Sequence, residues 1–192
     1  MEMQGQGVPR DPRRGLELTF AAARGGQAQA AHNLGMAYLQ GHGLPPDAVE
    51  AVRWLKIAAE NGVAEAQYNL GLLYYRGEGV QQRLFDALQW MRRGARGGYV
   101  PARKAVGRLY MTGLDTMGQD LTEARVWLTL AAGKGDREAR QWIAEIDRAE
   151  QQERAYAQQL QLLAAQTALY WAGAAFAAAL SPPTTYVEVD IY

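Results

Sequence analysis

Apolar residues recur along the chain at the three- and four-residue spacing of amphipathic helices. Ala66, Leu70 and Tyr74, for example, share one face of such a helix. The pattern predicts three helices of this kind, at residues 27–40, 63–76 and 99–112. A glycine follows each segment, as is common where a helix ends. The chain is therefore expected to be built mainly from helices.

A second set of helices is predicted between these segments. Asp47 with Glu50, and Asp120 with Glu123, have the three-residue spacing of a capping box, in which side chains satisfy the first backbone N–H groups of a helix. Arg83 occupies the same position in the middle unit, so the helix that follows it is expected to begin less firmly. Each unit therefore contains two antiparallel helices.

The residues of these helix pairs repeat every 36 positions, with one extra residue in the loop between Gly113 and Asp120. The matching columns are Ala30, Ala66 and Ala102; Leu34-Gly35, Leu70-Gly71 and Val106-Gly107; Tyr38, Tyr74 and Tyr110; Gly41, Gly77 and Gly113; Trp54, Trp90 and Trp127; and Gly62, Gly98 and Gly135. A fixed period of this length predicts a solenoid. The small residues let neighbouring helices approach closely, and the three tryptophans are expected to be buried between units.

These motifs resemble those of Sel-1-like repeats, which are related to the tetratricopeptide repeat. The copy that matches best carries Ala30, Leu34-Gly35, Tyr38, Gly41-His42-Gly43-Leu44, Asp47, Ala51, Trp54, Ala58-Ala59 and Gly62. The third copy is weaker, because Leu114 stands where the second glycine of the loop belongs. The resemblance covers residues 5–146 and implies an all-α, right-handed α-α solenoid that acts in protein–protein interaction, as an adaptor in bacterial assembly, secretion or signalling complexes.

The first unit is incomplete, because Gly5-Gln6-Gly7-Val8, Asp11 and Ala22-Ala23 match only the later part of a repeat. The chain opens inside a repeat, as expected of a piece of a longer protein. Residues 1–15 lack the apolar core of a secretory signal. The chain as it stands fits the cytoplasm, and it fits the periplasm if an upstream signal or membrane anchor has been removed.

The amino-acid composition excludes several kinds of catalytic and metal-binding sites. The 192 residues include 20 basic and 20 acidic side chains and no cysteine, so disulfides, thiolate metal sites and cysteine nucleophiles are excluded. His32 and His42 are the only histidines, and no carboxylate cluster or Ser–His–acid set accompanies them. The Gly-x-Gly triplets follow helices, so they are interpreted as turns rather than phosphate loops. The sequence predicts no catalysis, no metal and no cofactor.

Equivalent positions of successive units form columns along the solenoid. The columns used for packing repeat the same residue, whereas two columns on the first helices of the units carry different residues in each unit. In a tetratricopeptide-like stack such columns line the concave surface where partners dock. The candidate partner-binding residues are His32, Met36, Tyr68, Leu72, Lys104, Arg108, Gln141 and Glu145. The alternative is that the apolar members pack against another segment of the same protein.

Residues 87–114 hold six basic side chains. They are spread over the second helix of one predicted unit and the first helix of the next. They are Arg92, Arg93, Arg96, Arg103, Lys104 and Arg108, without an acidic residue among them. Three interpretations follow: a solvated face, a surface for an acidic protein partner, or a nucleic-acid contact. The neutral charge of the whole chain argues against a protein built mainly to bind nucleic acid.

The repeat ends after Trp142, and no charged residue occurs from Ala155 to Val187. A heptad seam, imperfect at Glu153, then predicts one helix from Asp136 to Leu180, about 65 Å long. The seam is formed by Trp142, Ile146, Ala149, Glu153, Tyr156, Leu160, Leu163, Thr167, Tyr170 and Ala174. It fits a cap on the solenoid, a dimerisation helix or, over Leu160–Leu180, a membrane span. Thr184–Tyr192 alternates apolar and polar residues, which predicts an extended strand.

The predicted organisation is therefore a repeat solenoid over residues 1–146, a long capping or dimerising helix over 147–180 and an extended tail over 181–192. The expected function is a non-catalytic adaptor that binds a protein partner through its concave groove, with an acidic protein as one candidate partner. Two alternatives stay open: an inhibitor or immunity protein that neutralises a bacterial toxin or enzyme, and a component of an envelope complex for secretion or polysaccharide export.

Overall fold

The computed structural model describes residues 12–113 and 118–180, and all regular structure in this part of the chain is α-helical. The helices are α1 (Pro12–Arg24), α2 (Ala28–Gln40), α3 (Ala48–Glu60), α4 (Ala64–Arg76), α5 (Leu84–Arg96), α6 (Val100–Thr112), α7 (Leu121–Ala132) and α8 (Arg137–Leu180). The glycine motif at residues 5–8 and the tail segment Thr184–Tyr192 lie outside the described residues.

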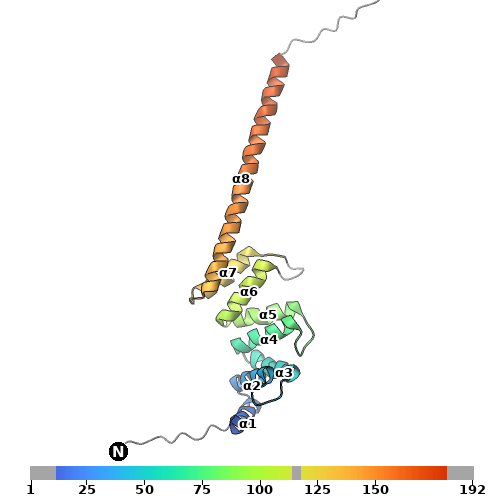
Figure 1. The fold of residues 1–192 in the computed structure, drawn as a ribbon, viewed down its shortest axis with the longest axis vertical. Helices are drawn as coiled ribbons and strands as arrows, with labels where there is room; N and C mark the ends of the chain where they lie inside the picture. The colour runs from blue at the N-terminus through green and yellow to red at the C-terminus, as the bar shows by residue number, and fades with distance from the viewer. Residues whose placement is uncertain (1–11, 114–117, 181–192) are drawn as a thin grey trace, which may run out of the picture. The chain divides into compact units, whose positions relative to one another are not determined.

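Helices that follow one another in the sequence pack against one another from α1 to α7 (Figure 1). Each unit pairs a first helix with a second helix, as in α2 with α3, α4 with α5 and α6 with α7. Helix α1 is the second helix of the incomplete first unit. This arrangement confirms the predicted all-α solenoid.

The helix ends follow the capping residues. Asp47 accepts hydrogen bonds from the backbone N–H groups of Val49 and Glu50, at 2.9 and 3.0 Å. Asp120 accepts one from Glu123 at 2.9 Å. Arg83 makes no side-chain capping bond to α5, and the expectation that α5 begins less firmly stays a prediction. The loop glycines 41, 43, 77 and 79 have positive φ angles, which confirms that these triplets form turns.

Paired helices approach each other closely at a buried glycine of each first helix. A Cβ atom added to Gly71 would lie 2.7 Å from Met91 Cγ and 2.9 Å from the carbonyl oxygen of Ala87, both on α5. The equivalent atom on Gly35 or on Gly107 would lie 2.6 Å from a leucine Cγ of the paired helix. The repeated glycine column is therefore a packing requirement of each helix pair.

The tryptophan column is less uniform than the sequence predicts. Trp54 and Trp127 are 9% and 7% exposed, as expected of side chains between units. Trp90 is only partly buried, so the prediction that all three are buried is wrong for it. The guanidinium of Arg93 lies 4.5 Å from the centroid of the Trp90 ring and covers one face of it at the surface.

The chain divides into two compact units, Met1–Ala144 and Glu145–Tyr192. Helix α8 is continuous over 44 residues, which confirms the predicted helix, and the side chain of Asp136 caps it by accepting a bond from Ala139 N–H at 2.9 Å. Between Gln151 and Leu180 every described side chain is exposed. Among the described helices, none combines the length and the apolar character that crossing a bilayer requires.

We expect Gly71→Ala to lower the free energy of unfolding by about 1–3 kcal/mol, because the added methyl group forces α4 and α5 apart. Gly15→Ala is the matched control, since nothing lies within 4 Å of a Cβ at that position of α1. That change should leave stability equal or raise it by up to about 1 kcal/mol. Urea unfolding followed by circular dichroism measures both, and equal midpoints for the two variants would contradict the packing role of Gly71.

Candidate functional site

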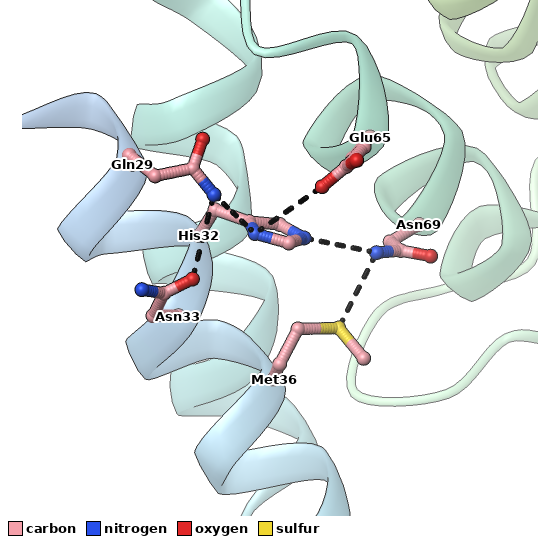
Figure 2. A network of polar contacts seen from close by, with 6 residues as sticks. All are labelled: Gln29, His32, Asn33, Met36, Glu65 and Asn69. Atoms are coloured by element: carbon pink, nitrogen blue, oxygen red, sulfur yellow. Dashed lines mark hydrogen bonds and ion pairs between the residues drawn. The ribbon is translucent and has the colours of Figure 1, made fainter. Parts of the chain in front are cut away.

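Residues at two positions of α2 meet residues at two positions of α4, the next first helix. At the junction of α2 and α4, His32 Nδ1 lies 4.0 Å from Glu65 Oε2, and His32 Nε2 lies 3.2 Å from Asn69 Nδ2 (Figure 2). Asn69 Nδ2 also donates to the sulfur of Met36 at 3.3 Å. His32 is 8% exposed. Positions 32 and 36 of α2 therefore face positions 65 and 69 of α4.

The imidazole of His32 is held by two side-chain amides. Gln29 Nε2 lies 3.2 Å from Nδ1, on the opposite edge of the ring from Asn69 (Figure 2). A neutral imidazole has one donor and one acceptor nitrogen, so one of the two amides must present its oxygen to the ring. With either tautomer, His32 is satisfied by residues of its own protein. Its role is to join two repeats.

The junction of α6 and α8 uses the equivalent four positions with charged and aromatic side chains. Lys104 Nζ lies 2.7 Å from Glu138 Oε2 and 3.4 Å from Asp136 Oδ2. The guanidinium of Arg108 lies 5.8 Å from the centroid of the Trp142 ring. Positions 104 and 108 thus face positions 138 and 142, as 32 and 36 face 65 and 69.

The two carboxylates neutralise Lys104. The hydrogen bond to Glu138 is the main cause that raises the pKa of Lys104, and the charge of Asp136 adds to it. The pKa of Asp136 is lowered, first by the N–H group of Ala139 and also by Lys104. The interpretation of six uncompensated basic side chains in residues 87–114 is therefore wrong for Lys104.

Other members of that basic stretch also serve the fold. Arg103 donates to the carbonyl oxygens of Ala95 and Leu130 at 3.1 and 3.3 Å. The guanidinium of Arg92 lies 5.9 Å from the centroid of the Tyr110 ring. Lys104 and Arg108 are the basic residues among the eight candidate positions, which we call the inner face of the first helices. Arg108 forms no ion pair with any residue that the structure describes, so of these two cations it is the one without a carboxylate partner there.

A third junction, between α4 and α6, lies between the two already described. Short side chains leave it open. Pro101 and Ala105 stand at the positions where the neighbouring junctions carry Glu65 with Asn69 and Glu138 with Trp142. A cavity of about 500 Å³ results, within the usual range for ligand pockets. It is lined by Tyr68, Leu72, Tyr75, Met91, Pro101, Lys104, Ala105, Arg108, Leu109, Thr112, Glu138 and Trp142.

Comparison with known proteins identifies the family to which this solenoid belongs. The Sel1 repeat matches residues 1–27, 28–63, 64–99 and 100–136. The chain belongs to the Sel1 repeat family. A crystal structure of a Sel1 repeat protein from Oxalobacter formigenes is similar to it, with 33% identity and a TM-score of 0.63 over 69% of this chain and 98% of that one.

A second solved structure is similar as well. It is a protective antigen present in uropathogenic Escherichia coli strains that displays an SLR fold, with 32% identity and a TM-score of 0.66 over 71% of this chain. The chain spans 29% of the length of that antigen. No curated protein matches the sequence. Sel1 repeats are generally protein-interaction modules and typically non-catalytic scaffolds.

The Sel1 solenoid brings some of the eight candidate residues together and separates others. Tyr68, Leu72, Lys104 and Arg108 line the cavity, whereas His32 and Met36 belong to the network at the α2–α4 junction. Gln141 and Glu145 are exposed and do not line it. Their columns face the next first helix, and no further repeat helix follows α8 in the described part of the chain.

The sequence did not identify the residues on the second side of each junction, where the next first helix faces the candidate residues. Pro101 and Ala105, with Glu138 and Trp142, line the cavity from columns that also vary between repeats. That variation is the signal that could have identified them. Within the described residues, no group of three or more His, Cys, Asp or Glu side chains is arranged to hold a metal ion.

Asp136→Asn keeps an acceptor for the capping bond but removes the charge that faces Lys104. Because the folded state lowers the pKa of Asp136 below 3.8, its carboxylate stabilises the protein above pH 3.8. This contribution is lost as the pH falls through the lower folded pKa. The variant should be less stable at neutral pH by about 1 kcal/mol, and the difference should shrink in acid. Urea unfolding at several pH values tests this, and a difference independent of pH would contradict it.

Proposed function

We propose that the chain is a non-catalytic adaptor that binds a protein partner through the inner faces of α4 and α6. The cavity at the α4–α6 junction is the observation that supports this function. It lies on columns that vary between repeats, and its lining includes tyrosine, tryptophan and arginine. These residue types contribute most of the binding energy at protein interfaces. No observation on the described residues favours the alternatives of an immunity protein or an envelope-complex component.

Site-specific photocrosslinking tests whether a partner occupies this face in the cell of origin. Tyr75, which lines the cavity and is 40% exposed, is replaced by a benzophenone amino acid. Phe85 on α5, which is 64% exposed and does not line the cavity, is replaced in the same way as the control. We expect a discrete crosslinked protein from position 75 only. Crosslinks from position 85 alone, or from neither position, would contradict the proposed face.

We expect Tyr68→Ala combined with Arg108→Glu to weaken binding of the crosslinked partner by at least about tenfold. Both side chains line the cavity; Arg108 is exposed and Tyr68 only partly buried at the edge of the core, so helical content should stay the same. Circular dichroism checks the fold and surface plasmon resonance measures affinity. A folded double variant with unchanged affinity would place the partner on the outer faces of the helices or on α8.

The exposed seam of α8 supports a second proposal, that two copies of the chain associate through this helix. Tyr156, Leu160, Leu163 and Tyr170 recur at heptad spacing and are 47% to 70% exposed. In a two-stranded coiled coil each seam residue meets residues of the same seam. No charge in the described residues from 155 to 180 opposes the pairing. The capping role predicted from the sequence competes with this proposal.

Removal of residues 155–192 distinguishes the interpretations of α8. Association of two copies predicts twice the chain mass before truncation and a monomer of similar stability after it, because the paired surface is removed. A cap predicts a monomer before truncation and a less stable solenoid after it. A full chain that is soluble only in detergent would instead support a membrane span. Analytical ultracentrifugation and urea unfolding of both chains provide the readouts.

A further inference from the structure

The cavity at the α4–α6 junction has an apolar interior. Leu72, Met91, Ala105 and Leu109 line it from three helices, and Met91 is 2% exposed. Pro101 adds a side chain without a polar atom. An apolar surface of this kind favours an apolar group of a ligand over water. A single aromatic or large aliphatic side chain is the natural anchor for such a cavity.

The charges around this interior leave one cation available. Lys104 is already paired with Glu138 and Asp136, so it is not available to pair with a ligand. Arg108 has no carboxylate partner among the described residues and is exposed. Its guanidinium lies 5.8 Å from the centroid of the Trp142 ring, and this stacking orients it beside the cavity. A guanidinium bonds a carboxylate through two parallel N–H groups, which favours a carboxylate as its partner.

Resting on the proposed adaptor function, we propose that this cavity binds a peptide segment of the partner that carries an aromatic or large aliphatic anchor close to an Asp or Glu. The anchor occupies the space above Ala105, and the carboxylate pairs with Arg108. Arg108 itself lines the cavity, so the acidic residue must lie close to the anchor in the segment. If the segment is helical, residues three or four apart have Cβ atoms about 5–6 Å from each other, which places the acidic residue within about four residues of the anchor. One unpaired arginine suits one carboxylate, whereas a nucleic acid would need a track of several cations.

A peptide-display selection tests this specificity on the full chain without knowledge of the natural partner. The probe is a phage-displayed library of random dodecapeptides, and the peptides that it enriches are then synthesised. We expect them to share an aromatic or large aliphatic residue with an Asp or Glu within about four positions. Fluorescence anisotropy measures the affinity of each labelled peptide for the wild-type chain and for the variants.

Three variants separate the anchor from the charge. Ala105→Phe fills the cavity, and it should weaken binding by at least about tenfold. Arg108→Glu should weaken the acidic peptides by a similar factor and should restore binding when the acidic residue of the peptide is changed to Lys. Arg93→Glu is the matched control, because Arg93 stacks on Trp90 and does not line the cavity. Its affinity should stay within about twofold of the wild type. If Ala105→Phe fails to fold, Ala105→Leu replaces it.

Several outcomes would overturn the inference. They are selection of no peptide, selection without acidic residues, or equal affinity for Arg108→Glu and the wild type. If a peptide without acidic residues still loses binding on Ala105→Phe, the adaptor function stands and only the carboxylate preference fails. If Ala105→Phe instead changes the mass of the chain in sedimentation, a second copy occupies the cavity and the inference of a separate partner is wrong. The adaptor function itself fails when no crosslink forms from position 75.

Discussion

The close approach of paired helices at one glycine per repeat is the constraint on which the rest of the structure depends. At Gly71 no side chain separates α4 from α5, and Met91 and the carbonyl of Ala87 occupy the space that a Cβ atom would need. The same approach recurs 36 residues earlier and later. Because each pair packs in the same way, each first helix presents equivalent positions to the next one. The inner face is therefore a series of equivalent junctions.

Three junctions of this series carry different chemistry on the same geometry. His32 with Asn69 gives a hydrogen-bonded contact, and Lys104 with Glu138 gives an ion pair. At the middle junction Ala105 leaves a cavity instead. The scaffold columns can repeat their residues because packing is the same in every pair, whereas the junction columns are free to differ. The capacity for recognition comes from this freedom.

The sequence predicts the scaffold well and the site only in part. Helices, caps and turns were predictable because they depend on neighbours in sequence, as Asp47 and Asp120 show. The partial exposure of Trp90 was not, since burial depends on how neighbouring units pack in three dimensions. Tyr68 and Arg108 could be placed on the inner face from the period alone.

The opposite wall of the cavity could not be placed in this way, because a period shows which positions are equivalent but not which of them meet. Pairing of position 104 with 138, rather than with 141, follows from the direction in which one first helix faces the next. Glu138 and Trp142 therefore required the three-dimensional arrangement. The interpretation of Lys104 changed for the same reason. In the sequence it belongs to a stretch of basic residues, whereas in the fold its charge is paired with the carboxylates of Asp136 and Glu138.

The filled junctions on either side also explain why an open one is tolerated. The network around His32 joins α2 to α4, and the pairing of Lys104 with Glu138 joins α6 to α8. Helices α4 and α6 are thus each held by a contact with a further first helix, and the apolar residues between them need not close on one another. A cavity formed before binding loses less conformational freedom when a ligand enters, so more of the contact energy remains as affinity. The stacking of Arg108 on Trp142 extends this argument to charge, because a guanidinium that is already oriented loses little entropy when it pairs with a carboxylate.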